Sequence, residues 1–126
     1  MAWVQVDTDE VLHWYRTMAL LNQMDTLLYN AQRQGRISFY MTSYGEEATH
    51  LGSASVLEED DIIYAQYRET GVLLYRGYTL QNAMDQCFSN QDDIGGGKQV
   101  CGVCVGGGWG KERVEEGVEG RMNGVR

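Results

Sequence analysis

The sequence predicts an α/β fold that is mostly helical, with one short strand and a glycine-rich tail that we expect to be disordered. Three observations predict it. Apolar residues recur at three- and four-residue spacing early in the chain, a short apolar run follows Asp60-Asp61, and glycines gather at the end. Residues 1–94 contain five of the sixteen glycines and residues 95–126 contain eleven. We therefore divide the chain into a folded region, 1–94, and a tail, 95–126, because glycine supplies no side chain to a core.

Length and composition are those of one globular domain. The chain has 126 residues, of which 43% are hydrophobic and 22% charged. Its net charge of −8 argues against nucleic-acid binding, which needs a basic surface, and against binding to anionic membranes. We see no apolar run near the roughly 18 residues of a membrane span, and no signal or transit peptide. Three cysteines do not suggest a secreted disulfide framework, so we expect a reducing, intracellular setting.

The first element is expected to be a long amphipathic helix. Thr8 or Asp9 can cap its start, and Gly35 can adopt the left-handed conformation that ends many helices. About 25 residues at 1.5 Å per residue give a length of roughly 38 Å. Its apolar stripe needs other elements to pack against, and we expect it to contain these residues: Val11, Tyr15, Met18, Leu21, Met24, Leu27, Leu28 and Ala31.

A second helix is expected to begin near Ser43. Ser43 and Glu46 have the spacing of a capping box, in which two side chains satisfy free amides of the first helical turn. Asp60-Asp61 ends the apolar pattern that follows. The residues of that pattern, at helical spacing, are Ala48, Leu51, Ala54 and Leu57.

One short strand and two short helices complete the folded region. The apolar run Ile62-Ile-Tyr-Ala65 predicts a short buried strand. A helix over 72–75 would end at Gly77, and Thr79 can cap the next helix. The inner face of that last helix is expected to carry Leu80, Ala83, Met84, Cys87 and Phe88.

Three segments carry a resemblance to a known family. They are Gln32-Arg-Gln-Gly-Arg-Ile-Ser-Phe-Tyr40, Gly45-Glu-Glu-Ala48 and Gln66-Tyr-Arg-Glu69. In order and spacing they resemble the alpha subunits of thiamine-diphosphate-dependent 2-oxo acid dehydrogenases, and residues 11–99 fit that pattern. The segment 33–40 resembles the branched-chain members in particular. The resemblance implies an N-terminal, mostly helical fragment of a thiamine-diphosphate-binding fold.

The resemblance also implies an activity and its partners. Members of the family decarboxylate branched-chain 2-oxo acids, such as 2-oxoisovalerate, and pass the acyl group to a lipoyl group on an acyltransferase. Thiamine diphosphate lies between an alpha and a beta chain of a heterotetramer and supplies the ylid that attacks the keto carbon. The implied partners are therefore the beta subunit, a second alpha chain and the acyltransferase. The implied location in a eukaryote is the mitochondrial matrix.

Four residues match family positions near the cofactor and the substrate. The resemblance implies that Tyr67 and Arg68 contact the diphosphate, and that Phe39 and Gln66 lie near the substrate pocket. A guanidinium can fork onto phosphate oxygens with charge-assisted bonds, and an apolar wall suits a branched aliphatic substrate. Tyr67 and Arg68 also follow the predicted strand, and ligands of α/β folds bind at the carboxyl ends of strands.

Ordinary structural roles are the alternative for these residues. On that interpretation Arg68 forms a surface ion pair with Glu69, and the aromatic side chains of Tyr67, Phe39 and Tyr40 serve packing. The remaining candidates have equally plain explanations. Glu46 and Glu47 suit the dipole of a first helical turn, while His13 and His50 have no partner at ligand spacing and are expected to be ordinary helix residues.

The family's magnesium ligands come from a Gly-Asp-Gly or Gly-Glu-Gly motif and a later Asn, which this chain does not contain. We therefore expect the chain to be inactive alone. The resemblance stops after Asp93-Ile-Gly-Gly-Gly-Lys-Gln99, where the family continues Met-Pro-x-His-Tyr. Every residue of 100–110 can be encoded with G and T alone, so we hypothesise that the tail is translated intron or shifted frame.

Two further functions remain as alternatives. The first is a truncated, non-catalytic chain that binds the beta subunit. The second is a metal or redox module at Cys101-Gly-Val-Cys104, since such a pair can be half of a zinc site or a redox dithiol. Tetrahedral zinc requires four ligands, and the sequence holds no second pair at the right spacing. A metal in this chain is therefore not expected.

Overall fold

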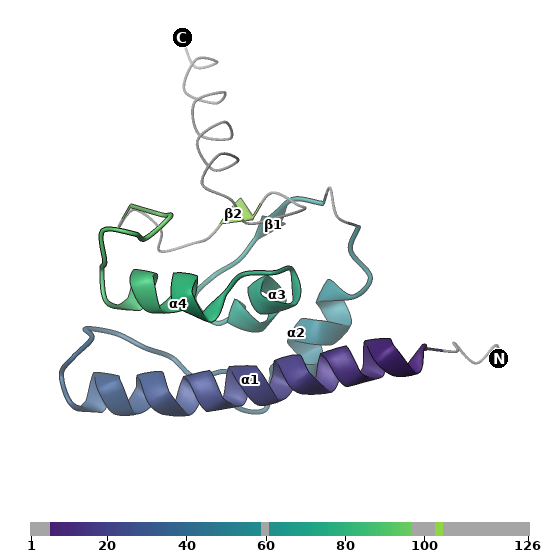
Figure 1. Ribbon diagram of the computed structural model, residues 1–126, viewed down its shortest axis with the longest axis horizontal. Helices are drawn as coiled ribbons and strands as arrows, with labels where there is room; N and C mark the ends of the chain where they lie inside the picture. Colours follow the sequence, from purple (N-terminus) through teal and green to yellow (C-terminus); the bar gives the residue numbers. More distant parts are fainter. Residues whose placement is uncertain (1–5, 59–60, 97–102, 105–126) are drawn as a thin grey trace, which may run out of the picture.

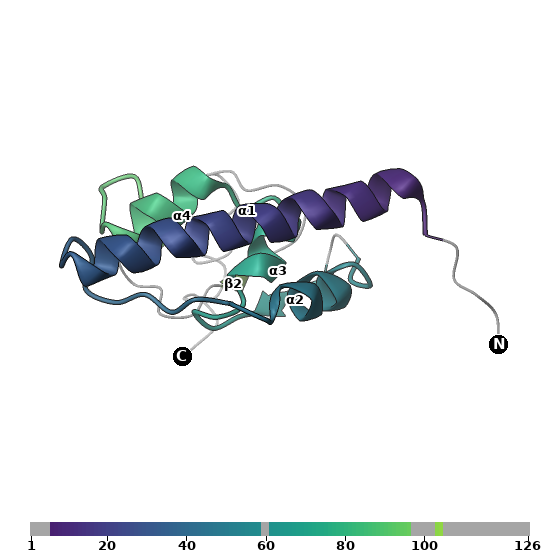
Figure 2. The same ribbon diagram turned by 90° about the horizontal axis from the view of Figure 1, so that it is seen from below.

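The computed structural model describes residues 6–58, 61–96 and 103–104 (Figure 1). Figures 1 and 2 show a long helix, α1, with the three shorter helices gathered along it. None of the helices within the described ranges is long and apolar enough to cross a membrane. In chain order the elements are α1 (Thr8–Arg33), α2 (Glu47–Ala54), β1 (Ile63–Tyr64), α3 (Thr70–Tyr75), α4 (Leu80–Cys87) and β2 (Val103–Cys104).

Helix α1 has the predicted length and the predicted end. It begins one residue after Asp7, whose backbone is extended, so Asp7 rather than Thr8 or Asp9 is the N-cap residue. At its other end Gly35 has φ of 72°, and the Arg36 amide donates to the Ala31 carbonyl over 3.0 Å. A glycine in the left-handed region closes the helix because that backbone conformation costs it little.

The buried face of α1 is narrower than the predicted apolar stripe. Val11, Tyr15 and Leu27 are 47%, 67% and 63% exposed, so their assignment to the buried face was wrong. The covering helices α2, α3 and α4 are short, and a short helix can cover only a strip of a 26-residue partner. The residues of α1 that are buried beneath them are Thr17, Leu21, Met24, Asp25 and Leu28.

One core cluster joins α1 to the later helices. Leu21 and Leu28 of α1 are 0% and 1% exposed and lie at its centre. Each fully buried leucine contributes about 1.5–3 kcal/mol relative to an exposed one. The full set of buried members is Leu21, Met24, Leu28, Ile37, Leu74, Tyr78 and Ala83.

Helix α2 begins later than the capping-box spacing predicts. Glu46 is the N-cap residue, and it makes no side-chain capping bond. The Ser43 amide instead donates a hydrogen bond to the Asp25 carboxylate. Ser43 is therefore buried in the segment before the helix begins. The helix ends at Ala54, and Leu57, predicted to continue its apolar face, is 38% exposed.

The predicted strand exists, but most of it is exposed. Ile63 and Tyr64 pair antiparallel with Cys104 and Val103, respectively. Tyr64 is 68% exposed and only Ala65 of the apolar run is buried, so the expectation of a buried strand was wrong. The strand β2, Val103–Cys104, lies in the tail. These two residues are therefore ordered, whereas the sequence analysis expected the whole tail to be disordered. Residues 97–102 and 105–126 of the tail lie outside the described residues.

The two short helices α3 and α4 follow the prediction closely. Gly77 ends the α3 turn with φ of 94°, and the hydroxyl of Thr79 accepts the Asn82 amide at the start of α4 over 3.1 Å. On α4, Ala83 is buried, whereas Leu80 and Phe88, predicted on its inner face, are 36% and 47% exposed. These two residues stand at the ends of the helix, where neighbouring elements no longer cover it.

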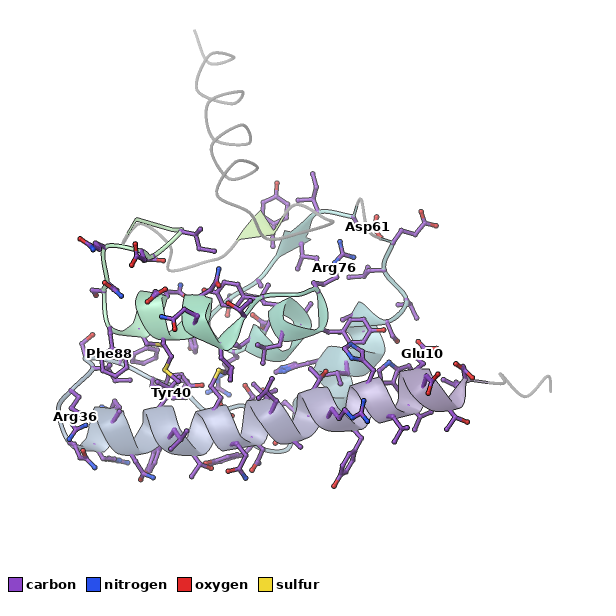
Figure 3. The ribbon with its side chains drawn as sticks, viewed as in Figure 1. Glu10, Arg36, Tyr40, Asp61, Arg76 and Phe88 are labelled. Carbon is purple, nitrogen blue, oxygen red and sulfur yellow. The ribbon has the colours of Figure 1, made fainter. Side chains whose placement is uncertain are left out.

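Arg76 ties α3 to the loop that leads into β1. Its guanidinium donates to the carbonyl of Glu58 and, over 3.4 Å, to the carbonyl of Asp61 (Figure 3). Backbone carbonyls in a loop otherwise depend on water for hydrogen bonds. Arg76 thus fixes the path of the chain just before the strand that precedes the candidate site.

Gly71 allows three helices to approach one another closely. A Cβ atom at this position would lie 2.6 Å from Nδ1 of His50, on α2, and 2.9 Å from Cδ2 of Leu21, on α1. Such distances are well inside van der Waals contact, so an alanine cannot be placed there without movement. Gly52, in the middle of α2, has open space around the corresponding position.

This contrast gives a matched pair of substitutions. Gly71→Ala should lower the free energy of unfolding by about 1–3 kcal/mol, because it overpacks the junction of the three helices. Gly52→Ala should raise it by about 0.5–1 kcal/mol, because alanine has the higher helix propensity. Urea denaturation measures both, and equal effects of the two substitutions would contradict the packing role of Gly71.

Candidate functional site

The aromatic residues singled out in the sequence come together in space. The rings of Phe39 and Tyr67 meet edge to face, with centroids 5.3 Å apart and an interplanar angle of 86°. Phe39 belongs to the segment between α1 and α2, and Tyr67 belongs to the turn between β1 and α3. Both rings are about half exposed, at 56% and 46%. The pair therefore forms an aromatic surface rather than part of the core.

Arg68 lies beside this pair and faces solvent. Its side chain is 44% exposed, and Nη1 lies 3.9 Å from Oε1 of Glu46. The ordinary structural role considered for Arg68 was a surface ion pair with Glu69, but its ion pair in the structure is with Glu46. The backbone of Arg68 is also held, because the Ser43 hydroxyl donates to its carbonyl over 3.2 Å. The segments around Ser43 and Arg68 are thus joined directly.

Gln66 starts the turn that presents these residues. Its side chain is exposed, and its amide donates to the carboxylate of Glu69. The amide of Glu69 returns a bond to the Gln66 carbonyl over 3.3 Å, which closes the turn. Gln66, Tyr67 and Arg68 thus follow directly after β1, and Phe39 joins them through its contact with Tyr67.

A buried carboxylate that the sequence analysis missed organises this region. Asp25 is 0% exposed, and its two oxygens each accept one bond of 2.6 Å, from the Tyr40 hydroxyl and from the Ser43 amide. Burial raises the pKa of Asp25 above its ordinary value of 3.8, while the bonds from Tyr40 and Ser43 oppose that rise. Burial and the neighbouring Asp25 likewise raise the pKa of Tyr40.

A sequence signal for this carboxylate does exist. Asp25 stands within the apolar stripe formed by Leu21, Met24 and Leu28, where a charged residue is out of pattern. An acidic residue on the buried side of a helix needs donors from elsewhere in the fold. Its two donors, Tyr40 and Ser43, follow within the next segment of the chain.

The two glutamates at the start of α2 have different surroundings. The Glu47 carboxylate accepts the Gly45 amide over 2.8 Å and the Asn22 side-chain amide over 3.4 Å. Hydrogen bonds, first from its own backbone amide and then from Asn22 and Gly45, lower the pKa of Glu47 against a small opposing effect of burial. Glu46 lies between Arg68 and His50. A favourable interaction with the helix dipole is therefore not the whole role of Glu46, because its carboxylate also faces two side chains.

The two histidines also differ. The His13 ring packs against the ring of Tyr75, with centroids 5.2 Å apart, as expected of an ordinary helix residue. His50 is 6% exposed, and its Nδ1 has no hydrogen-bond partner among the described residues. Its Nε2 lies 3.9 Å from Oε2 of Glu46. His50 is thus a buried neighbour of the candidate site rather than a surface residue.

No metal centre is found in the part of the chain that the structure describes, since no three His, Cys, Asp or Glu side chains there could hold an ion together. The dithiol alternative is not addressed, because Cys101 and the side chain of Cys104 lie outside the described residues. Cys87 is half-buried, and burial raises the pKa of its thiol. The described site presents a guanidinium and a phenol, both of which can donate hydrogen bonds to an anion.

Comparison with known proteins identifies the family to which the chain is similar. The sequence model of the "Dehydrogenase E1 component" family matches residues 15–106, a match that ends seven residues beyond Gln99. Several relatives are mitochondrial 2-oxoisovalerate dehydrogenase alpha subunits. The Caenorhabditis elegans protein is 61% identical over 94 residues, covering 75% of this chain and 22% of the relative.

A second animal relative and a plant relative give a similar result. The subunit from Mus musculus is 59% identical over 92 residues, covering 73% of this chain and 21% of that protein. The alpha 1 subunit from Arabidopsis thaliana is 50% identical over 97 residues, covering 77% and 21%. The chain therefore spans about a fifth of the length of the curated relatives it matches.

The raised pKa of Asp25 predicts a characteristic pH dependence. The folded chain binds this proton more tightly than the unfolded chain, so the contribution of Asp25 to stability is complete below pH 3.8. It is lost as the pH rises through the folded-state pKa. Asp25→Asn keeps the shape and cannot titrate. The free energy of unfolding of the wild type minus that of the variant should therefore fall as the pH rises, by at most about 1.4 kcal/mol per pH unit.

Denaturation in urea at a series of pH values measures this difference. The subtraction removes the contributions of the titrating groups that do not interact with Asp25, which both chains share. A difference that stays constant, or that grows with rising pH, would show that burial does not dominate the titration of Asp25.

Proposed function

The chain belongs to the dehydrogenase E1 component family, and from this membership we propose that it is part of the alpha subunit of a branched-chain 2-oxo acid dehydrogenase. The observation that carries the proposal is the 61% identity, over 94 residues, to a 2-oxoisovalerate dehydrogenase alpha subunit. The proposed reaction is oxidative decarboxylation of a branched-chain 2-oxo acid, with transfer of the acyl group to a lipoyl group.

We propose that Tyr67 and Arg68 contact the diphosphate of thiamine diphosphate. The cofactor, when bound, supplies the carbanion that attacks the keto carbon of the substrate. The residues fit such a group: the Arg68 guanidinium is half exposed, and a single ion pair at 3.9 Å leaves it donors to offer. Charge-assisted bonds to phosphate oxygens are stronger than that contact. The Tyr67 hydroxyl adds a neutral donor from the adjacent position.

For the substrate pocket we propose Phe39 and Gln66. The ring of Phe39 is 56% exposed and braced by Tyr67, so it can present an apolar wall to a branched side chain. The exposed amide of Gln66, two residues before Arg68, supplies a polar group at the same edge. Magnesium ligands are assigned to parts of the enzyme other than the described residues of this chain.

The proposed partners are the beta subunit, a second alpha chain and the lipoyl-bearing acyltransferase. We propose the mitochondrial matrix as the location, because the relatives are named mitochondrial. The outward side of α1 favours a second candidate function, binding to the beta subunit without catalysis. It exposes several large apolar side chains, a feature typical of protein interfaces: Val11, Leu12, Tyr15, Leu20, Leu27 and Tyr29.

The diphosphate proposal can be tested on the chain alone. Tyr67 and Arg68 together supply about 3–6 kcal/mol of binding, on the basis of roughly 1.5–3 kcal/mol for each charge-assisted bond. Millimolar affinity corresponds to about 4 kcal/mol and micromolar affinity to about 8 kcal/mol. Calorimetry should therefore detect no micromolar binding of thiamine diphosphate, and NMR should detect weak binding of inorganic diphosphate.

In the NMR titration, the Nε–H signal of Arg68 should move as diphosphate is added. Arg36, an exposed arginine just beyond the C-terminal end of α1 (Figure 3), serves as the internal control and should move much less. Equal movement of both signals would indicate non-specific attraction of the anion and would contradict the proposed contact.

A further inference from the structure

We propose that Glu46 is a positioning residue for Arg68: it is the resting counter-ion of the guanidinium, and an arriving diphosphate must displace it. This inference rests on the proposed diphosphate contact of Arg68. Glu46 is the N-cap residue of α2, so its backbone is fixed where the chain enters the helix. Its carboxylate lies 3.9 Å from Nη1 of Arg68 through one oxygen and 3.9 Å from Nε2 of His50 through the other.

Neither contact of Glu46 is a hydrogen bond. Both distances exceed the roughly 3.2 Å limit of a good N–H···O bond, so the carboxylate is shared between two nitrogens rather than committed to one. Its side chain is 47% exposed and that of Arg68 is 44% exposed. Solvent therefore screens the attraction between them. An exposed ion pair of this kind is easily exchanged for a stronger one.

His50 is the fixed member of this group. Its side chain is 7% exposed, and it packs against α3 at Gly71, where even a Cβ atom would lie 2.6 Å from its Nδ1. Asp25 and Glu47 also act on His50 electrostatically, but Glu46 is the carboxylate in range of its Nε2. When Glu46 releases Arg68, the nitrogen of His50 that it already faces offers it an alternative partner.

The carboxylate and a diphosphate compete for the same guanidinium. Phosphate oxygens accept short, charge-assisted bonds from arginine, often two at once, whereas Glu46 holds Arg68 at 3.9 Å. Glu46 therefore keeps Arg68 in place before the anion arrives and yields to it afterwards. Removing the charge of Glu46 should abolish this competition and should tighten binding of the anion.

The test is a titration of the 126-residue chain with inorganic diphosphate, followed at the Arg68 Nε–H signal by NMR. Glu46→Gln removes the charge and keeps the shape. Glu10→Gln, in the first turn of α1, removes one charge about 18 Å along the helix from Asn22, which contacts Glu47 beside Glu46, and is the matched control (Figure 3). The dissociation constant of diphosphate should fall about threefold in Glu46→Gln, the scale of an exposed ion pair, and stay unchanged in Glu10→Gln.

A second readout separates positioning from a purely structural role. Before any diphosphate is added, the Arg68 Nε–H signal should shift in Glu46→Gln and not in Glu10→Gln, because the guanidinium has lost its counter-ion. Equal dissociation constants in all three chains, with Arg68 still responding to diphosphate, would overturn the role of Glu46 and leave the diphosphate contact standing. No response of Arg68 in any chain would overturn both.

Discussion

The carboxylate of Asp25 is the constraint on which the candidate site depends. It lies fully buried between the leucines of the α1 face, and a charge there is tolerated only with good partners. The Tyr40 hydroxyl and the Ser43 amide supply them, at 2.6 Å each. These bonds draw the segment after α1 back along the helix. Phe39 then meets Tyr67, and the Ser43 hydroxyl reaches the carbonyl of Arg68.

Local patterns in the sequence were sufficient to predict the helices. The length of α1, its end at Gly35 and the cap at Thr79 were all predicted, because each depends on a few neighbouring residues. The roles of the four site residues come from resemblance and stay a prediction; the structure shows only that Phe39 meets Tyr67, next to Gln66 and Arg68 in the chain. The division at residue 94 stays a prediction. The partners of Asp25 were not predicted, because they depend on how the segment after α1 folds back onto the helix rather than on spacing within one element.

The errors have the same origin. Ser43 has the spacing of a capping residue, but its amide is taken by Asp25, so α2 starts after Glu46. Tyr15 and Leu27 fit the apolar period of α1 and are nevertheless exposed, because the later helices are too short to cover them. Gly71 gave no signal in the sequence, since the closeness of His50 and Leu21 depends on how three helices pack. A periodicity describes one element, whereas burial and hydrogen-bond partners depend on several.

The most direct test of this account is hydrogen exchange at the Ser43 amide in Asp25→Ala. In the wild type this amide is buried and donates a hydrogen bond to the carboxylate, so its hydrogen should exchange slowly. The variant should lose that protection, while the helical amides of Gln34 and Ser55, which donate to Asn30 and Leu51, should keep theirs and report an intact fold. If Ser43 stays as protected in the variant as in the wild type, Asp25 does not hold the segment that builds the site.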